Sequence, residues 1–200
     1  VLGLVEARLG SSNILCGVLS TANLAAQQFG AFTYSGTSWS FAEKMPAGFP
    51  NFACPITRRF SFATLNDLLI ISDFGTSALK KFDGSADVAD LWAGNTPSKA
   101  KYLCTVRDFL FAAYTTEGAG ADVFPYRIRW SDAGLPDTWT NTSYWDLGRK
   151  DGDICMGLAP LQDLIVAFKR NSIWVGAYTN QPPWYYFDTV VPDKGCIAPF

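Results

Sequence analysis

Three stretches of the chain share one pattern, in which two apolar runs flank a polar residue followed by Asp. The central pairs are Asn66-Asp67, Arg107-Asp108 and Gln162-Asp163. Two apolar runs separated by two such residues are typical of a β-hairpin with a two-residue loop. Asp suits these loops because its carboxylate accepts hydrogen bonds from nearby backbone N–H groups. Each copy therefore predicts one hairpin.

The run after each pair is apolar without alternation, which indicates strands covered on both faces. These runs are residues 68–71, 109–113 and 164–168. A third strand is predicted at 77–82, 126–130 and 172–178, and a fourth at 88–92, 138–140 and 184–190. In Tyr126–Trp130, apolar residues alternate with Arg127 and Arg129, the period of a half-buried strand.

Four short strands per repeat is the plan of a β-propeller blade. The three Asp residues are 41 and 55 positions apart, near the spacing of about 40–50 residues found for blades. We therefore predict an all-β fold with three four-stranded blades, at about 53–92, 93–145 and 146–200. Three blades do not close a ring, because propellers typically have about 4–8. We expect these blades to belong to a larger propeller.

Residues 1–52 are predicted as an N-terminal segment with a linker, and the sequence does not decide the structure of this segment. Residues 20–28 contain good helix formers after Ser20 or Thr21, either of which could cap a helix. Residues 30–34 and 38–41 instead read as a hairpin around Ser35-Gly36. Because the chain starts at Val1 and stops abruptly at Phe200, we expect it to be a portion of a longer protein.

Composition narrows the class of protein. Hydrophobic residues make up 48% of the chain and aromatic residues 15%, which excludes a disordered protein. The net charge is −2 and the basic residues are dispersed, so a DNA-binding module that works by its own positive field is disfavoured. A membrane span is not expected, since no stretch of 18 apolar residues occurs.

The chain contains no histidine, which removes Ser-His-Asp and Cys-His catalysis from its own residues. Five cysteines occur without a Cys-x-x-Cys pair, at positions 16, 54, 104, 155 and 196. We expect reduced, buried thiols rather than a zinc or redox site. We predict no catalytic, cofactor-binding or metal-binding residue, no cofactor, and a protein that is not an enzyme.

Two other classes stay open. A carbohydrate-binding or polysaccharide-degrading propeller would draw paired carboxylates from Asp67, Asp108, Asp132, Asp137 and Asp163. The aromatic run Trp184–Phe187 could stack on sugars or bases, although packing between blades is favoured. The other class is a cellular propeller scaffold for protein partners.

The loop Ser131–Trp139 misses the Asp-box spacing of sialidase-like propellers, and we expect Trp139 to anchor it.

A longer pattern covers the second half of the chain. It runs through the segments 129–139, 145–148, 151–154, 157–174 and 193–199. Their central residues are Arg129-Trp-Ser-Asp132, Trp145-Asp-Leu-Gly148, Gly157-Leu-Ala-Pro160 and Gly195-Cys-Ile-Ala-Pro199. This pattern resembles the β-propeller segments of bacteriophage tail and neck proteins. These include the nozzle proteins of short-tailed phages and the packaged-DNA stabilisation (hub) proteins.

The resemblance implies a structural protein of the virion tail, assembled in the host cytoplasm and without catalytic residues. Such subunits form homo-oligomeric rings, commonly six-fold, below the portal and adaptor. They extend the DNA channel, help to retain and eject the genome, and carry tail fibres. Packaged DNA would pass through the ring without sequence-specific contact. The mild acidity of the chain fits that role, because tight phosphate contacts would hinder sliding.

Overall fold

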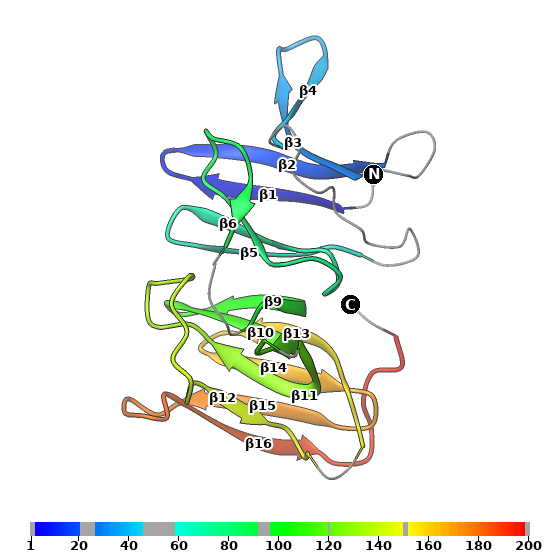
Figure 1. The fold of residues 1–200 in the computed structure, drawn as a ribbon, viewed down its shortest axis with the longest axis vertical. Coiled ribbons are helices and arrows are strands. Elements are labelled where there is room, and N and C mark those ends of the chain that lie inside the picture. The colour runs from blue at the N-terminus through cyan, green and yellow to red at the C-terminus, as the bar shows by residue number, and fades with distance from the viewer. Residues whose placement is uncertain are drawn as a thin grey trace.

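The protein folds into β-sheets stacked one after another in chain order (Figure 1). The computed structural model describes residues 3–20, 27–45, 59–91, 97–119, 121–149 and 152–198. Within these ranges there are sixteen strands and no helix, so the all-β prediction is confirmed. The strands form four antiparallel sheets of four strands each, and every sheet uses four consecutive strands.

We number the sheets I to IV. Sheet I consists of β1 (Gly3–Leu9), β2 (Ser12–Ser20), β3 (Gln27–Tyr34) and β4 (Trp39–Glu43). Sheet II consists of β5 (Ser61–Leu65), β6 (Leu68–Ser72), β7 (Lys80–Phe82) and β8 (Ala89–Asp90). Sheet III consists of β9 (Lys99–Val106), β10 (Phe109–Glu117), β11 (Asp122–Trp130) and β12 (Tyr144–Asp146). Sheet IV consists of β13 (Cys155–Leu161), β14 (Leu164–Lys169), β15 (Ile173–Tyr178) and β16 (Tyr185–Val191).

The three predicted hairpins are present with the predicted two-residue loops. Asn66-Asp67 joins β5 to β6, Arg107-Asp108 joins β9 to β10, and Gln162-Asp163 joins β13 to β14. Asn66 and Asp67 have φ angles of 48° and 59°. A type I′ turn requires positive φ at both central residues, and Asn and Asp tolerate this conformation better than most residues. The local sequence therefore dictates where each sheet begins.

The second strand of sheets II to IV is the apolar run without alternation, and it is largely buried on both faces. β6, β10 and β14 each present three or more buried residues in succession. Neighbouring strands cover their edges. Neighbouring sheets cover both faces of sheets II and III, and sheet III covers one face of sheet IV. This confirms the interpretation of these runs as interior strands.

The sheets pack face to face, with the first strands β1, β5, β9 and β13 of successive sheets in contact. Aromatic pairs contribute to each interface. Phe29 meets Phe82 between sheets I and II, with ring centroids 5.2 Å apart, and Phe74 meets Tyr102 between sheets II and III at 5.6 Å. Phe111 meets Tyr185 between sheets III and IV at 4.7 Å. Offset or edge-on ring pairs of this kind add to the burial of apolar area.

Sheets I and IV lie at opposite ends of the stack, so the described chain does not close on itself (Figure 1). The face of sheet I turned away from sheet II exposes Leu4, Tyr34 and Trp39, and the outward face of sheet IV exposes Leu161 and Val190. Alternate residues of the same strands are buried in the stack. Each end of the stack is therefore an apolar face that no described residue covers.

The structure corrects several local expectations. The hairpin reading of the N-terminal segment is confirmed by the pairing of β3 with β4, with Tyr34 opposite Trp39. Ser20, Gln27 and Gln28 belong to strands rather than to a helix, and residues 21–26 lie outside the described residues. The fourth strand of sheet III is Tyr144–Asp146, whereas residues 138–140 belong to the preceding loop.

Candidate functional site at the tip face

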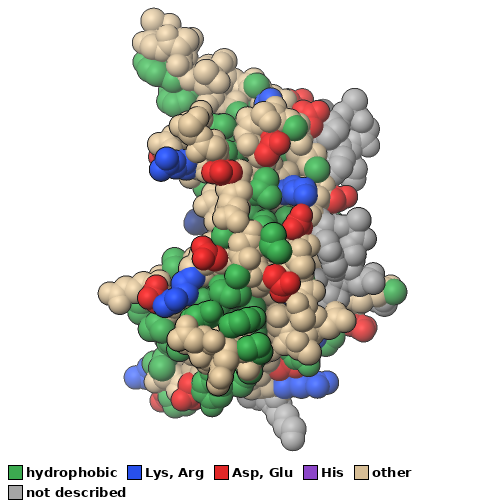
Figure 2. All heavy atoms as spheres, turned by 90° about the vertical axis from the view of Figure 1, so that its left-hand side faces the viewer, with side chains coloured by type: hydrophobic (Ala, Val, Ile, Leu, Met, Phe, Trp, Pro, Cys, Tyr) green, Lys and Arg blue, Asp and Glu red, His purple; other side chains and the backbone are tan. Residues whose placement is uncertain are grey.

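The first turn of every sheet lies on the same side of the stack, and we call this side the tip face. It consists of the turns 10–11, 66–67, 107–108 and 162–163, together with the loops 131–143 and 179–184. Figure 2 looks onto this side, where hydrophobic side chains gather in the lower half, over sheets III and IV. Sequence analysis alone did not predict that the turns come together.

Polar contacts join each turn to the next. The backbone N–H of Gly10 donates to Oδ1 of Asp67 at 3.0 Å, and Nδ2 of Asn66 donates to the carbonyl oxygen of Gly134. Nη2 of Arg107 lies 3.1 Å from Oδ2 of Asp163. These contacts hold the turns of sheets I to IV in one row.

All five candidate carboxylates lie on the tip face, and four of them have a partner for the side chain. Asp67 and Asp163 take part in the row just described, and Asp132 accepts a hydrogen bond from Oγ1 of Thr140 at 2.9 Å. Asp137 lies 3.6 Å from Nζ of Lys81. Asp108 contributes its backbone oxygen, which accepts from the N–H of Gly134 at 2.6 Å. The carboxylates are thus tied to separate partners within the row of turns and loops.

The loop 131–143 is a structured element. Ser131 is buried, and its Oγ accepts a hydrogen bond from the N–H of Leu110 at 3.1 Å. Asp132 forms an isolated bridge with Leu135. Trp139 is buried, and its indole N–H donates to the carbonyl oxygen of Pro136 at 3.0 Å. The prediction that Trp139 anchors this loop is confirmed.

The loop 179–184 is fixed in a similar way. Oγ1 of Thr179 donates to the carbonyl oxygens of Gln181 and Pro183, at 2.7 and 2.5 Å. The N–H of Thr179 donates to the carbonyl oxygen of Trp184 at 2.9 Å. These bonds place the half-buried Trp184 parallel to Tyr178, with an interplanar angle of 8° and ring centroids 6.1 Å apart.

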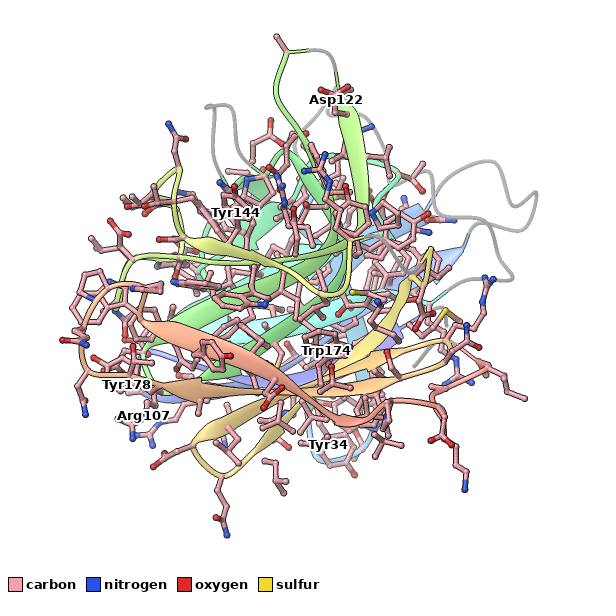
Figure 3. The ribbon with its side chains drawn as sticks, turned by 90° about the horizontal axis from the view of Figure 1, so that it is seen from below. Tyr34, Arg107, Asp122, Tyr144, Trp174 and Tyr178 are labelled. Atoms are coloured by element: carbon pink, nitrogen blue, oxygen red, sulfur yellow. The ribbon has the colours of Figure 1, made fainter. Side chains whose placement is uncertain are left out.

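Arg107 lies over the Tyr178 ring of this aromatic group. Its guanidinium carbon is 4.8 Å from the centroid of the Tyr178 ring. Figure 3 shows Arg107 and Tyr178 together at one end of the molecule, away from Trp174 of the same sheet. A guanidinium over an aromatic ring at this distance is a cation–π contact.

Between the two loops lies a groove, which we call the III–IV groove. It contains two adjoining hollows of about 410 and 340 Å³ that share Thr140 and Trp184. The larger is lined by Trp130, Thr140, Thr142, Ser143, Pro182, Pro183 and Trp184, and the smaller by Phe109, Asp132, Ala133, Thr140, Tyr178 and Trp184. A hollow of this size with aromatic walls and a few polar groups has the character of a small-ligand site.

Two polar groups beneath the groove are buried without a hydrogen-bond partner. They are the indole N–H of Trp130 and the hydroxyl of Tyr185, and both side chains are 0% exposed. Their ring centroids are 5.9 Å apart in the interface between sheets III and IV. Burial raises the pKa of Tyr185, so its hydroxyl stays protonated. Unpaired buried donors are uncommon in folded proteins and call for an explanation.

A buried ion cluster in sheet III was not expected from the sequence. Arg127 donates to Asp146 at 2.6 Å and to Glu117 at 3.0 Å, and Nε of Arg129 lies 3.5 Å from Glu117. The alternation in β11 suggested that both arginines face solvent, yet both are buried. The acidic partners stand on β10 and β12, so only the strand pairing reveals them.

The charges of the cluster balance one another. Burial disfavours the charge of Arg127, but the hydrogen bond to Asp146 and the nearby Glu117 outweigh it and raise the pKa of Arg127. Burial lowers the pKa of Arg129, and Glu117 offsets only part of that effect. Phe124 and Tyr144 lie over the Arg127 guanidinium at 3.9 and 4.1 Å. These contacts cover the charged cluster with aromatic side chains of sheet III.

Other predicted site chemistry is placed as follows. Cys16, Cys104 and Cys155 are buried and Cys196 is half-buried, and within the described ranges none of them forms a disulfide, while Cys54 lies outside the described residues. Within the described ranges, no three His, Cys, Asp or Glu residues gather closely enough to hold a metal ion. The same ranges contain no helix long and apolar enough to cross a membrane.

Of the aromatic run at the C-terminal strand, Tyr185 and Phe187 are in the core and Tyr186 is exposed. Trp184 is the member that reaches the groove.

Comparison with protein-family models gives no match, and comparison with curated proteins gives none either.

Proposed function

We propose that the chain is a structural β-propeller subunit of a bacteriophage tail, of the nozzle or hub type. In this proposal the four sheets are successive blades, and the subunit joins a ring that extends the DNA channel and helps to retain and eject the genome. The observation that carries the proposal is the stack of four consecutive antiparallel sheets packed through their first strands. The resemblance of the segments within 129–199 supplies the tail role.

The distribution of charge supports passage of DNA without tight binding. Arg127, Lys80 and Arg107 are each paired with a carboxylate at 3.1 Å or less. Cations that are already neutralised release few counterions from DNA, so they contribute little affinity for phosphate. With a net charge of −2, the chain offers a weak field to a sliding duplex.

The open end faces support assembly with further protein. Sheets I and IV each leave apolar side chains uncovered at the end of the stack. Exposed apolar area of this kind marks contact surfaces in proteins that work in assemblies. Within the proposal, the partners are other copies of the subunit, the portal or adaptor, and tail fibres.

Electron microscopy of the native particle that contains this chain tests the proposal. The chain would be located by gold-labelled antibodies and by single-particle reconstruction. The expected result is a ring of subunits on the portal axis, with DNA or a plug in its lumen. A chain that is found only outside virions, as a monomer, would overturn the tail role.

A further inference from the structure

The III–IV groove has a chemistry that a structural role does not use. It combines an aromatic platform, a row of hydroxyl groups, one carboxylate and an unpaired indole N–H. The platform is Trp184, the hydroxyls belong to Thr140, Thr142 and Ser143, and the carboxylate is Asp132. This set of groups does not depend on whether the chain belongs to a phage tail.

Trp184 has a surface available for stacking. Tyr178 covers one face of its ring with nearly parallel planes. The larger hollow is lined by Trp184 but not by Tyr178, so this hollow lies against the remainder of the indole. The face of an aromatic ring carries partial negative charge and attracts polarised C–H groups. A pyranose ring presents such C–H groups on one side and hydroxyls around its rim.

The polar groups of the groove match those hydroxyls. Asp132 can accept hydrogen bonds beyond the one from Thr140, because a carboxylate has about four acceptor positions. The threonine and serine hydroxyls both donate and accept. The indole N–H of Trp130 has no partner in the structure, and leaving such a buried donor unpaired is costly. Because the Trp130 side chain is 0% exposed, a ligand oxygen reaches this N–H only after a rearrangement of the groove.

Nucleic acid is disfavoured as the occupant. Asp132 lines the groove, and the nearby Arg107 is paired with Asp163 at 3.1 Å. A phosphate entering there would meet negative charge, and no Lys or Arg is among the described residues that line the groove. Neutral hydroxyl groups are the better match.

We propose that the III–IV groove binds a sugar residue of a neutral polysaccharide. In this proposal Trp184 stacks on the pyranose ring, and Asp132, Thr140 and Thr142 hydrogen-bond with its oxygens. The two adjoining hollows accommodate two neighbouring sugar units, so an oligosaccharide binds more tightly than a monosaccharide.

The test is a titration of the full ¹⁵N-labelled chain, followed by NMR of the tryptophan side-chain N–H signals. The chain carries Leu4→Lys and Val190→Lys, two exposed positions outside the groove, to limit association through the ends of the stack. The sugars are the methyl glycosides of glucose, galactose and N-acetylglucosamine, with maltohexaose and chitohexaose as oligosaccharides. At least one sugar is expected to shift the Trp130 and Trp184 signals saturably, and its oligomer is expected to bind more tightly. Binding is weakened ~10-fold or more by Trp184→Ala, because the stacking area is lost.

A second variant keeps the test independent of folding. Thr142→Arg fills the larger hollow from an exposed position and is expected to abolish the shifts while near-UV circular dichroism stays unchanged. Matched controls are Trp39→Ala, on the exposed Tyr34–Trp39 pair of sheet I, and Thr64→Arg, at the exposed position of β5. Both controls are expected to bind like the parent.

Three results would overturn the proposal. One is the absence of any shift at Trp130 and Trp184 with every sugar. Another is sugar binding that survives Trp184→Ala and Thr142→Arg, or that is lost in Trp39→Ala. The third is a response to a peptide or an oligonucleotide, with none to the sugars.

Discussion

At the scale of single residues, Glu117 is the carboxylate that pairs with both buried arginines of sheet III. It accepts from Oγ1 of Thr115 at 2.5 Å and pairs with both Arg127 and Arg129. The side chains of Glu117 and Arg129 are 8% and 3% exposed. Removing one member of a buried ion network leaves the remaining charges unpaired in a medium of low dielectric constant.

Replacing Glu117 by Gln keeps the shape and removes the charge. Breaking a buried pair in this way is expected to lower the free energy of unfolding by about 3–5 kcal/mol. Urea unfolding followed by fluorescence measures this value. The exposed Glu6→Gln serves as the control and should change it by less than about 0.5 kcal/mol. A Glu117→Gln protein as stable as the parent would show that the cluster is not a stability determinant.

The buried cysteines predict a dependence on alkaline pH. Burial raises the pKa of Cys16 from 9.0 to about 11 and that of Cys104 to about 12. Both thiols therefore stay protonated in the folded protein at pH 9.5, where unfolded cysteines ionise. Their contribution to stability is complete below pH 9.0 and is lost as the pH rises to about 11–12.

Alkylation with iodoacetamide at pH 9.5, mapped by mass spectrometry, measures this protection. Cys196, which is half-buried, is expected to react in the native protein, whereas Cys16 and Cys104 react only after urea is added. Rapid native alkylation of Cys104 would contradict its placement in the core.

At the scale of elements, β15 passes the core only because residue 176 is Gly. A Cβ placed there would lie 2.5 Å from the Phe187 ring and 2.6 Å from Ile165. Both neighbours are buried between sheets III and IV, so they have little room to move.

Gly176→Ala is therefore expected to destabilise the protein by about 1–3 kcal/mol through overpacking. Thermal unfolding followed by circular dichroism gives the size of the effect. The adjacent, exposed Ala177→Ser should lie within about 0.5 kcal/mol of the parent. Equal stability of the two variants would mean that the side chains of Phe187 and Ile165 shift freely to make room for a Cβ at residue 176.

Local signals predicted the inner strands well and the outer strands less well. The turns at Asn66-Asp67, Arg107-Asp108 and Gln162-Asp163 depend on residues adjacent in sequence, so their hairpins are readable. The fourth strand of sheet III is short and forms only because Tyr144–Asp146 pairs with β11. The prediction instead placed this strand around the apolar Trp139, which lies in the preceding loop. The III–IV groove joins loops from two sheets, and no pattern within either loop indicates the other.

At the scale of the whole molecule, the stack has two uncovered apolar ends. Leu4 on sheet I and Val190 on sheet IV are 55% and 56% exposed. An uncovered apolar sheet face drives association in water, because covering it removes apolar area from solvent. We expect the 200-residue chain, expressed alone, to self-associate and to be poorly soluble.

Charged substitutions at the ends test this expectation. Leu4→Lys together with Val190→Lys should raise solubility and shift the chain toward monomer in light scattering coupled to size-exclusion chromatography. The control Val123→Lys alters an equally exposed valine in the β10–β11 hairpin, away from both end faces, and should have little effect. A parent chain that is monodisperse and monomeric at high concentration would contradict the expectation.

Within the described part of the chain, each sheet is built from four strands that follow one another in sequence, and each of these strands pairs only within its own sheet. A gene segment that encodes one sheet therefore encodes all four of the strands that pair with one another. Duplicating or deleting such a segment would change the number of sheets without breaking a strand pairing. The row of polar contacts between neighbouring turns then becomes the feature that a newly added sheet must match. We expect the protein to tolerate the gain or loss of a whole sheet where the turn residues that dock one sheet on the next are kept.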